Sequence, residues 1–182
     1  MSTLTQTQET VPTGTWVGDP VHSHVGFEIG YASGIFRGTF APFEACLDVD
    51  ADGNGALVGE ARADSVHVLD ENLTAHLLAP DFFDAEREPV LRFASSDIRR
   101  SGSDLTIAGE LTIKGISVPV EIAGTVGDPF PYPDGSERLP LTLEATVDRR
   151  TFGIDWNMEL PNGRPALAND VKLTAEIFLV KA

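Results

Sequence analysis

The sequence contains a single cysteine, Cys46, among its 182 residues. One thiol cannot form an intrachain disulfide, and it cannot supply a metal cluster that needs several cysteine ligands. This scarcity is compatible with a reducing compartment. We interpret Cys46 as a small buried residue of a strand rather than as a reactive thiol.

Positive charge is also scarce in this sequence. The 13 Lys and Arg residues stand against 28 Asp and Glu residues, which gives a formal net charge of −15 at pH 7. A surface of this sign repels phosphate polymers, whose binding needs clustered basic side chains. The longest basic runs, Arg99–Arg100 and Arg149–Arg150, are too short to hold an anionic membrane surface. We therefore expect no nucleic-acid partner.

Long apolar runs are missing as well. No window of about 18 residues is both apolar and uncharged, so the sequence predicts no transmembrane helix and no stable membrane insertion. Residues 1–13 are polar, without the basic start and apolar stretch of a secretory signal, and we expect a cytoplasmic location. Because residues 1–12 contain little to bury, we expect a disordered tail in front of one domain over residues 13–182.

Motifs that nominate catalytic residues are absent from the sequence. There is no G-x-S-x-G elbow, no H-E-x-x-H helix, no P-loop and no G-x-G-x-x-G between a strand and a helix. Acidic residues are abundant, but a general acid and base pair requires a geometry that abundance does not supply. We expect a protein that is not an enzyme and that carries no cofactor.

Two patterns imitate metal sites. Residues 48–53 resemble the first half of a calcium-binding loop, yet Gly59 stands where the bidentate glutamate belongs, so we favour a solvated hairpin. His22 and His24 lie two apart and would share one face of a strand, but spacing identifies no third ligand. We expect both histidines to have structural or hydrogen-bonding roles, and we expect no bound metal.

The dominant pattern that is present is an alternation of apolar and polar residues. It is clearest over residues 105–114, and it recurs over 118–126, 141–147, 171–179 and 24–31. A period of two places apolar side chains on one face of a strand and polar side chains on the other. The alternation therefore predicts an all-β protein whose strands have one buried face.

The connections between these segments favour antiparallel neighbours. Short glycine-containing turns lie at residues 52–55, 101–103 and 114–115. The apolar phase changes between Ile35 and Val49, and a bulge or bend at Ala41-Pro42 would correct it. Long bent strands of this kind close β-barrels.

One segment lacks the alternation of apolar and polar residues that is typical of strands. Residues 70–78 place Leu73 and Leu77 four apart behind a capping Asp70 or Asn72, which predicts a short helix that ends before Pro80. Two adjacent aromatic residues follow at 82–83, in a segment too short and acidic for a core strand. We predict that residues 72–84 form a flap over one mouth of the barrel, with Phe82 or Phe83 turned inward.

The interior of such a barrel can be packed or hollow, and side-chain size decides between these alternatives. Aromatic residues fall on the predicted inward face, and inward glycines, Gly38, Gly109 and Gly124, would leave room beside them. We infer an apolar tunnel. The predicted ligand contacts along the tunnel and flap are Phe27, Ile29, Tyr31, Phe36, Phe40, His76, Leu77, Phe82, Phe83, Phe93, Ile107, Leu111, Ile113, Phe152 and Trp156.

Some of these residues have two interpretations. His76 either contacts a ligand head group or has a capping or solvent-facing role. Phe152, Ile154 and Trp156 either close or line the barrel or pack within its core, and core packing is the more frequent role of such residues. Arg37 either pairs with an acid on the outer surface or neutralises a polar head group.

Short motifs also occur in a defined order along the chain. They are Trp16, Asp19-Pro20-Val21-His22-Ser23, Phe27, Arg37-Gly38 with Phe40, Asn72, His76-Leu77, Asp81-Phe82-Phe83-Asp84, Phe93-Ala94-Ser95-Ser96, Gly109-Glu110-Leu111-Thr112-Ile113-Lys114-Gly115, Pro119-Val120 and Arg150-Thr151-Phe152-Gly153. Together they resemble the YceI family from Thr15 to the C-terminus. The resemblance implies an extended, lipocalin-like eight-stranded antiparallel barrel with a helical insert, which binds polyisoprenoid chains, isoprenoid quinones or related amphiphiles, often as a dimer. The family usually carries a histidine where this chain has Tyr31.

Three functions are compatible with these sequence patterns. The favoured one is a protein that binds, sequesters or transports a long apolar lipid inside the barrel, with an isoprenoid-type lipid as its ligand. The alternatives are a stress-related interaction module with a packed barrel, and an enzyme that acts on a lipid-like substrate. A continuous internal cavity would separate the first from the second.

Overall fold

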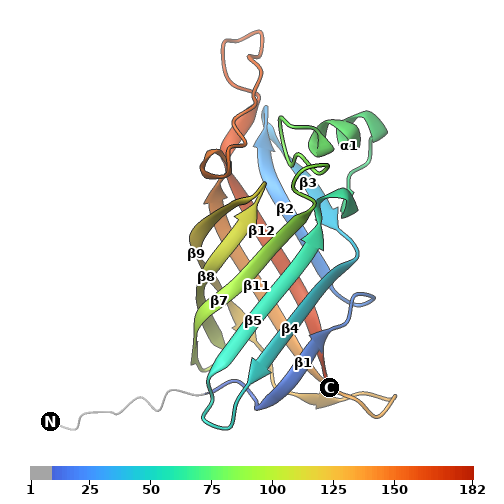
Figure 1. Ribbon diagram of the computed structural model, residues 1–182, viewed down its shortest axis with the longest axis vertical. Helices are drawn as coiled ribbons and strands as arrows, with labels where there is room; N and C mark the ends of the chain where they lie inside the picture. The colour runs from blue at the N-terminus through green and yellow to red at the C-terminus, as the bar shows by residue number, and fades with distance from the viewer. Residues whose placement is uncertain (1–9) are drawn as a thin grey trace, which may run out of the picture.

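A computed structural model describes residues 10–182 and shows a closed antiparallel β-barrel (Figure 1). Eight strands form the closed wall: β1 (Gly14–Gly18), β4 (Phe43–Val49), β5 (Gly55–Arg62), β7 (Val90–Ser101), β8 (Asp104–Ile113), β9 (Ile116–Val126), β11 (Glu137–Asp148) and β12 (Leu167–Lys181). Their order around the barrel is β11-β9-β8-β7-β5-β4-β1-β12, and the pairing of β12 with β11 closes the ring. The predicted eight-stranded barrel is confirmed.

The long strand β12 extends the wall beyond the closed ring. Near its end it pairs with β1 at Leu179–Lys181, and along Leu167–Glu176 it pairs with β2 (His24–Tyr31). Strand β3 (Gly34–Phe40) pairs with β2 and with the two-residue strand β6 (Val66–His67). This hairpin lies at the end of the barrel where α1 (Glu71–Leu78) lies (Figure 1).

The predicted bend at Ala41-Pro42 is present between two strands. Strand β3 ends at Phe40 and β4 begins at Phe43, and both phenylalanines are buried although they have opposite parity. An uninterrupted strand would place one of them on the outer face. The break at residues 41–42 therefore lets both aromatic rings enter the interior.

The turns also follow the sequence. The hairpin between β4 and β5 is held by the Asp50 carboxylate, which accepts hydrogen bonds from the backbone N–H groups of Asp52 and Asn54. Gly53 has a φ of +87°, a left-handed conformation that favours glycine. The acidic segment is thus a self-capped turn. Among residues 10–182, no three His, Cys, Asp or Glu side chains are grouped to hold a metal ion.

Helix α1 begins and ends as its sequence predicts. The Asp70 side chain accepts a hydrogen bond of 2.8 Å from the backbone N–H of Leu73, which is an N-terminal cap. The helix ends at Leu78, before Ala79 and Pro80, because a residue that precedes proline disfavours the helical conformation. Two 3₁₀ turns, η1 (Ala63–Ser65) and η2 (Arg149–Phe152), and the short strand β10 (Phe130–Pro131) complete the described elements.

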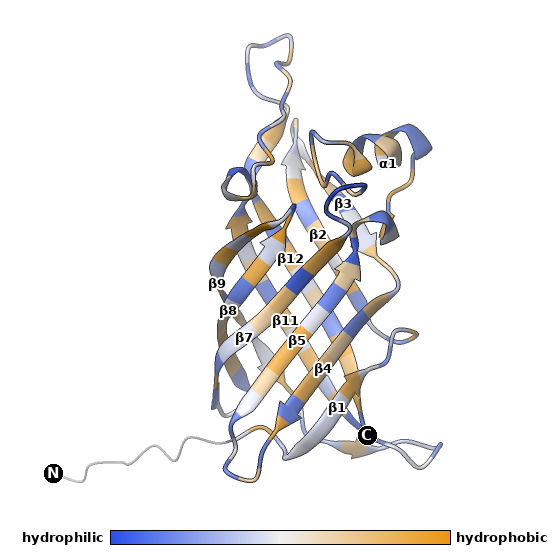
Figure 2. Cartoon of the chain, viewed as in Figure 1, coloured by the Kyte–Doolittle hydropathy of each residue, from blue (hydrophilic) through white to orange (hydrophobic). Residues whose placement is uncertain are grey.

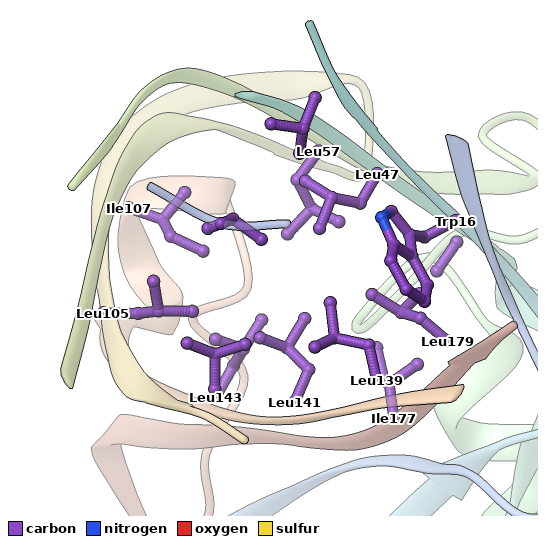
Figure 3. Packing of buried hydrophobic residues seen from close by; sticks show 14 of the residues in the cluster. Trp16, Leu47, Leu57, Leu105, Ile107, Leu139, Leu141, Leu143, Ile177 and Leu179 are labelled. Carbon is purple, nitrogen blue, oxygen red and sulfur yellow. The ribbon is translucent and has the colours of Figure 1, made fainter. Parts of the chain in front are cut away.

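The end of the barrel opposite α1 is filled by a packed core, which we call the plug. Its members are buried and point into the barrel from most of the strands (Figure 3). The plug comprises Val11, Trp16, Leu47, Leu105, Ile107, Val126, Leu139, Leu141 and Leu179. A second buried cluster lies toward α1 and includes Phe27, Phe40, Leu77, Phe82 and Phe152. Apolar and polar residues alternate along the strands that carry both clusters (Figure 2).

The start of the domain lies earlier than the sequence suggests. Val11 is buried in the plug, the Pro12 carbonyl accepts a hydrogen bond from Trp16 Nε1, and the Thr10 carbonyl accepts one from Arg100 Nη1. Residues 10–12, which the sequence places in a disordered tail, therefore contact the barrel. The rest of that predicted tail, residues 1–9, lies outside the described residues. No described helix has the length and apolar character needed to cross a bilayer.

Cys46 occupies strand β4 as expected, but its side chain does not face the interior. Its neighbours Ala45 and Leu47 are buried, whereas Cys46 is only half-buried because the alternation of the strand turns it outward. Burial raises the pKa of the thiol, and the nearby Asp48 carboxylate raises it further. A raised pKa keeps the thiol protonated and poorly nucleophilic.

Candidate functional site

Two cavities lie inside the barrel on the α1 side of the plug. The upper cavity, beneath α1 and the segment that follows it, has a volume of about 380 Å³. The middle cavity, between the upper one and the plug, has a volume of about 180 Å³. Their walls share Phe40, Leu91, Ile113 and Leu173, so the two cavities are neighbours along the barrel. The interior is therefore hollow over its upper and middle parts and solid at the other end.

The upper cavity is built from elements that are distant in the sequence. Strands β2 and β3 form one side, the η2 turn and residues 154–158 form another, and β12 contributes its first half. Helix α1 and residues 82–83 cover it, as the predicted flap requires. In Figure 1 the flap and the long loop before β12 stand at the same end of the barrel.

The structure brings together nearly all of the residues predicted to contact a ligand. The upper cavity is lined by Phe27, Ile29, Tyr31, Phe36, Phe40, His76, Leu77, Phe82, Phe83, Ile113, Phe152 and Trp156. The middle cavity is lined by Phe93 and Leu111, together with Phe40 and Ile113. Their shared location agrees with the sequence, and their contact with a ligand stays a prediction.

Ile107, which the sequence predicts to contact a ligand, lies in the plug and lines neither cavity. Its side chain is 1 % exposed and belongs to the plug, packed with residues such as Leu105. Strand β8 carries one continuous apolar face from Leu105 to Ile113, and the plug fills only the first part of that face. Alternation identifies the inward face of a strand, but it carries no information on depth along the barrel.

Both aromatic residues of the flap turn inward, where the sequence predicted one or the other. Phe82 is 9 % exposed and packs 5.5 Å from the Trp156 ring, while Phe83 meets the Phe40 ring edge-on at 5.7 Å. The flap is not a strand at this point. Backbone N–H groups of Phe82 and Phe83 donate to the carbonyls of Ala79 and Leu77 in a compact turn, so neighbouring side chains do not alternate.

His76 lies within an aromatic cluster at the upper cavity. Its ring meets Phe82 edge-on at 4.9 Å and Trp156 edge-on at 4.7 Å between ring centroids. Its Nε2 atom lies 3.4 Å from an Asp81 carboxylate oxygen. His76 thus lines the cavity and is not a helix cap, which favours the first of its two interpretations.

Arg149 is a charged residue that lines the upper cavity, and the sequence does not predict this position. It is 4 % exposed and lines the upper cavity. Its Nη1 atom donates to the carbonyls of Ile154 and Trp156, and its Nε atom donates to the Ala168 carbonyl. Burial lowers the pKa of this guanidinium. In the sequence, Arg149 belongs only to a two-residue basic run, and such a run gives no sign that one member is buried.

The sequence predicts open space beside the inward glycines, but the structure shows that neighbouring atoms occupy this space. A Cβ atom on Gly38 would lie 2.5 Å from the Phe27 ring, and one on Gly109 would lie 2.6 Å from the Phe93 ring. At Gly124 the obstacle is the Thr142 carbonyl of the neighbouring strand. The space of Gly38 and Gly109 is thus taken by aromatic rings, which lie against the wall and leave the centre of the barrel free.

Arg37 and the two N-terminal histidines lie away from both cavities. Arg37 forms an exposed ion pair with Glu28 at 3.0 Å, so the surface interpretation is confirmed. His22 Nδ1 lies 2.7 Å from Asp19 Oδ2, as expected for a hydrogen-bonding role. His24 is exposed on β2, opposite Glu176.

Asp19 organises a polar network at the plug end. Besides His22, it pairs with the largely buried Arg138, whose Nη1 donates to Asp19 Oδ2 at 2.5 Å. The hydrogen bond from His22, followed by that from Arg138, holds the pKa of the Asp19 carboxyl well below its usual range. Arg138 also pairs with Asp134 and stacks over the Tyr132 ring. This network joins the β1–β2 turn to β11 and lies outside the cavities.

Comparison with known proteins places these features in context. The YceI-like domain family matches residues 16–179 of the chain. A UPF0312 protein of Staphylococcus aureus strain USA300 is 29 % identical over 164 residues, which cover 86 % of this chain and 92 % of that protein. A UPF0312 protein of Staphylococcus epidermidis strain RP62A has the same identity and coverage.

Solved structures with the same fold have lower sequence identity. BcnA of Burkholderia cenocepacia has a TM-score of 0.73 at 20 % identity, covering 88 % of this chain and 98 % of its own. The YCEI protein of Campylobacter jejuni has a TM-score of 0.67 at 22 % identity, covering 80 % and 84 %. A polyisoprenoid-binding domain of Saccharophagus degradans has a TM-score of 0.67 at 10 % identity, covering 92 % and 98 %.

Proposed function

Because the chain belongs to the YceI-like domain family and encloses two adjoining cavities, we propose that it binds a long apolar lipid inside the barrel. The ligand class is a polyisoprenoid, an isoprenoid quinone or a similar amphiphile. The protein sequesters or carries this lipid and does not transform it.

The hollow, apolar upper and middle barrel is the observation that supports this proposal most strongly. Its walls carry aromatic and aliphatic side chains, and the few polar ones at the upper cavity include Tyr31, His76 and Arg149. The upper volume of about 380 Å³ falls in the range of about 300–1,000 Å³ that is typical of small-molecule sites. The adjoining middle cavity makes the space elongated, which suits a chain better than a compact ligand.

The energetics favour a hydrocarbon tail as occupant. Each CH₂ group removed from water contributes about 0.8 kcal/mol, so a tail of about ten carbons supplies several kcal/mol after its ordering cost is deducted. An apolar cavity gives up no hydrogen bonds when a tail enters it. Affinity would therefore depend on the length and branching of the tail.

The comparisons support an isoprenoid tail in particular. The Saccharophagus degradans neighbour is described as a polyisoprenoid-binding domain, and it shares the fold over 92 % of this chain. Methyl branches of an isoprenoid could fill the spaces between aromatic rings along the wall, such as those of Phe27, Phe36 and Phe40.

The two alternative functions receive less support. A packed interaction module requires a filled interior, and the upper and middle barrel contain cavities. An enzyme would need a nucleophile or an acid and base pair aimed at a substrate. The His76–Asp81 contact at 3.4 Å is packed among the rings of Phe82 and Trp156, and the sequence carries no motif for a nucleophile. We therefore favour binding over catalysis.

The test is recovery and uptake of a lipid. Native mass spectrometry of the purified protein, followed by organic extraction, should recover a hydrophobic passenger, and delipidated protein should take up a prenyl quinone with a change in Trp fluorescence. Trp156 lines the upper cavity and would report on the occupant. Protein that is repeatedly recovered empty and takes up no prenyl lipid would contradict the proposal.

A matched pair of variants locates the binding. Ala61 lines the middle cavity, whereas Ala123 is exposed on the outer face of β9. Ala61→Phe should weaken uptake by about tenfold or more, because overpacking costs about 1–3 kcal/mol and about 1.4 kcal/mol is tenfold in affinity. Ala123→Phe should leave uptake unchanged. Equal effects of the two substitutions would argue against an internal site.

A further inference from the structure

Arg149 is a buried charge without a counter-ion. Its side chain belongs to the wall of the upper cavity and is 4 % exposed, yet it forms no ion pair within 4.0 Å with any carboxylate of residues 10–182. Arg138, buried to a similar degree, pairs with both Asp19 and Asp134. A guanidinium removed from water is costly unless something compensates its charge.

The nearest acidic residues in the sequence do not supply this compensation. Asp148 is engaged by Arg150, whose Nε and Nη2 atoms contact its carboxylate at 3.0 and 2.7 Å. Asp155 is exposed and makes no ion pair with another described residue. Both carboxylates attract the Arg149 charge without contacting it, which raises the pKa of the guanidinium. Burial lowers this pKa by more, so the net direction is downward.

The guanidinium of Arg149 is held in a fixed orientation. Nε donates to the Ala168 carbonyl at 2.8 Å, and Nη1 donates to the carbonyls of Ile154 and Trp156 at 2.9 and 2.8 Å. Nη2 has no hydrogen-bond partner within the described part of the chain. Three neutral carbonyls orient this planar group without neutralising it, and its remaining N–H edge is available to a ligand in the cavity.

Other polar groups gather at the same end of the cavity. Trp156, whose carbonyl accepts from Arg149, also contacts the His76 ring at 4.7 Å, and Tyr31 lines the same cavity. Toward the middle cavity the shared wall is apolar, with Phe40, Leu91 and others. The wall of the cavity is therefore almost wholly apolar, and Arg149 places a positive charge beside its few polar groups.

We propose that Arg149 binds the anionic oxygen head group, a phosphate or a carboxylate, of the amphiphile whose tail fills the barrel. The inference rests on the proposed lipid-binding function and specifies which lipids are preferred. The head group lies beside η2 and the flap, and the tail runs toward the plug. An anion would neutralise the buried charge of Arg149. The planar guanidinium can also donate hydrogen bonds to the oxygens of a phosphate or a carboxylate.

A series of ligands with one shared tail tests this on the unmodified protein. Geranylgeranyl phosphate, geranylgeranoic acid, geranylgeraniol and a ubiquinone of the same prenyl length are compared by displacement of a fluorescent apolar probe. The phosphate, the carboxylate or both should bind about 10- to 100-fold more tightly than the alcohol and the quinone, because a hydrogen bond to a charged group contributes about that factor. Whichever of the two anionic ligands binds more tightly identifies the head group as a phosphate or a carboxylate.

Variants connect the preference to Arg149. Arg149→Met should reduce the advantage of the anions over the alcohol to about onefold, and Arg149→Lys should keep part of it. Arg150→Met is the matched control, since Arg150 is exposed and engaged by Asp148, and it should keep the full preference. Because Arg149 also holds residues 154–168 in place, circular dichroism and thermal unfolding accompany each variant.

The outcomes separate this inference from the proposed function. Equal affinity for anions and alcohol in the unmodified protein, or tighter binding of the neutral quinone, overturns the head-group assignment and leaves lipid binding intact. Binding of none of the four ligands overturns both. A preference for anions that persists in a folded Arg149→Met variant also overturns the assignment.

Discussion

At the scale of single residues, glycines shape the cavity by making space for aromatic rings. Gly38 lies directly across from Phe27 in the β2–β3 pairing, and the ring occupies the place of its missing side chain. Phe93 lies over Gly109 in a similar way. A ring that lies against the wall in this manner covers the backbone and leaves the axis of the barrel open.

Gly38→Ala should therefore narrow the cavity. The new methyl group would lie 2.5 Å from the Phe27 ring and would push it toward the ligand space. We expect a loss of about 1–3 kcal/mol, as for other overpacked sites, distributed between the free energy of unfolding and that of lipid binding. Lipid titration and urea unfolding measure the two. Gly34→Ala, in the same strand but exposed and free of such contacts, is the control and should change neither.

A second residue-scale prediction concerns acid stability. Hydrogen bonds from the Arg150 side chain, and then from its backbone N–H, lower the pKa of Asp148 from its usual 3.8 to about 2. Between these values the folded protein keeps Asp148 ionised while the unfolded chain takes up a proton. The stabilisation is thus complete above about pH 4 and is lost as the pH falls through about 2.

Asp148→Asn should weaken this acid dependence. Urea unfolding midpoints of the unmodified protein should fall between about pH 5 and about pH 2, and part of that fall should be missing in the variant because it has no carboxylate to protonate. The remaining fall reflects other carboxylates, Asp19 among them, whose pKa is also lowered. An identical pH profile for the two proteins would contradict the role given to Asp148.

At the scale of elements, a lysine adds hydrogen bonds to the aromatic packing that holds the flap on the barrel. Lys114, in the β8–β9 turn, donates from Nζ to the Pro80 carbonyl at 2.5 Å and to the Gly153 carbonyl at 3.2 Å. Pro80 belongs to the flap, and Gly153 follows η2. Lys114 therefore links three elements at the rim of the upper cavity. A lipid must pass this rim if it enters from the flap end.

Loosening this link should change the rate of exchange more than the affinity. Lys114→Met retains the aliphatic stem but removes both hydrogen bonds, so we expect faster release of a bound prenyl lipid in stopped-flow transfer to vesicles, by about threefold to tenfold for a net loss of about 1 kcal/mol. Lys172→Met removes an exposed lysine that pairs with Glu144 on the outer wall, and it should release lipid at the unmodified rate. Release from Lys114→Met at the unmodified rate would show that this link does not control the exit of the lipid.

At the scale of the whole molecule, one end of the barrel is filled by the plug and the other end contains the cavities. The plug supplies close packing, as Trp16 and Leu139 are fully buried there, while the upper half leaves apolar surface uncovered. Uncovered apolar surface contributes less to folding than packed surface, because contacts across a void are lost. Stability should therefore come chiefly from the plug, and ligand affinity from the cavities.

Two leucine-sized residues of strand β8 test this division. Ile107 lies in the plug and Leu111 lines the middle cavity, four residues further along the same face. Ile107→Ala should lower the free energy of unfolding by about 2–5 kcal/mol with little effect on lipid affinity. Leu111→Ala should cost less stability, because its side chain already faces a void, and it should weaken lipid binding. Calorimetry with and without lipid distinguishes them, and equal losses of stability would refute the division.

Much of this architecture was predictable because its signals are local. Alternation over residues 105–114 and 171–179 specifies strands and their inward faces, and the break at Ala41-Pro42 follows from a change of parity. The capped helix behind Asp70 follows from side-chain hydrogen bonding within one turn. Each of these features depends on residues only a few positions apart.

Other features required the folded chain. Ile107 and Leu111 have the same pattern, and only the closure of the barrel decides which of them is packed and which faces a cavity. The Arg149 side chain is enclosed by the carbonyls of Ile154 and Trp156 and by that of Ala168 in β12. The space beside Gly38 is occupied by the Phe27 ring, which comes from β2.

The sequence by itself thus determined the strands, their buried faces and the flap, and nearly all of the residues that it nominated as ligand contacts do line a cavity. Tertiary structure alone decided where the solid core ends and where the one uncompensated buried guanidinium of the described chain lies. The physical reason is that secondary structure responds to neighbours along the chain. Cavities and buried charges depend instead on what distant segments place, or fail to place, around each side chain.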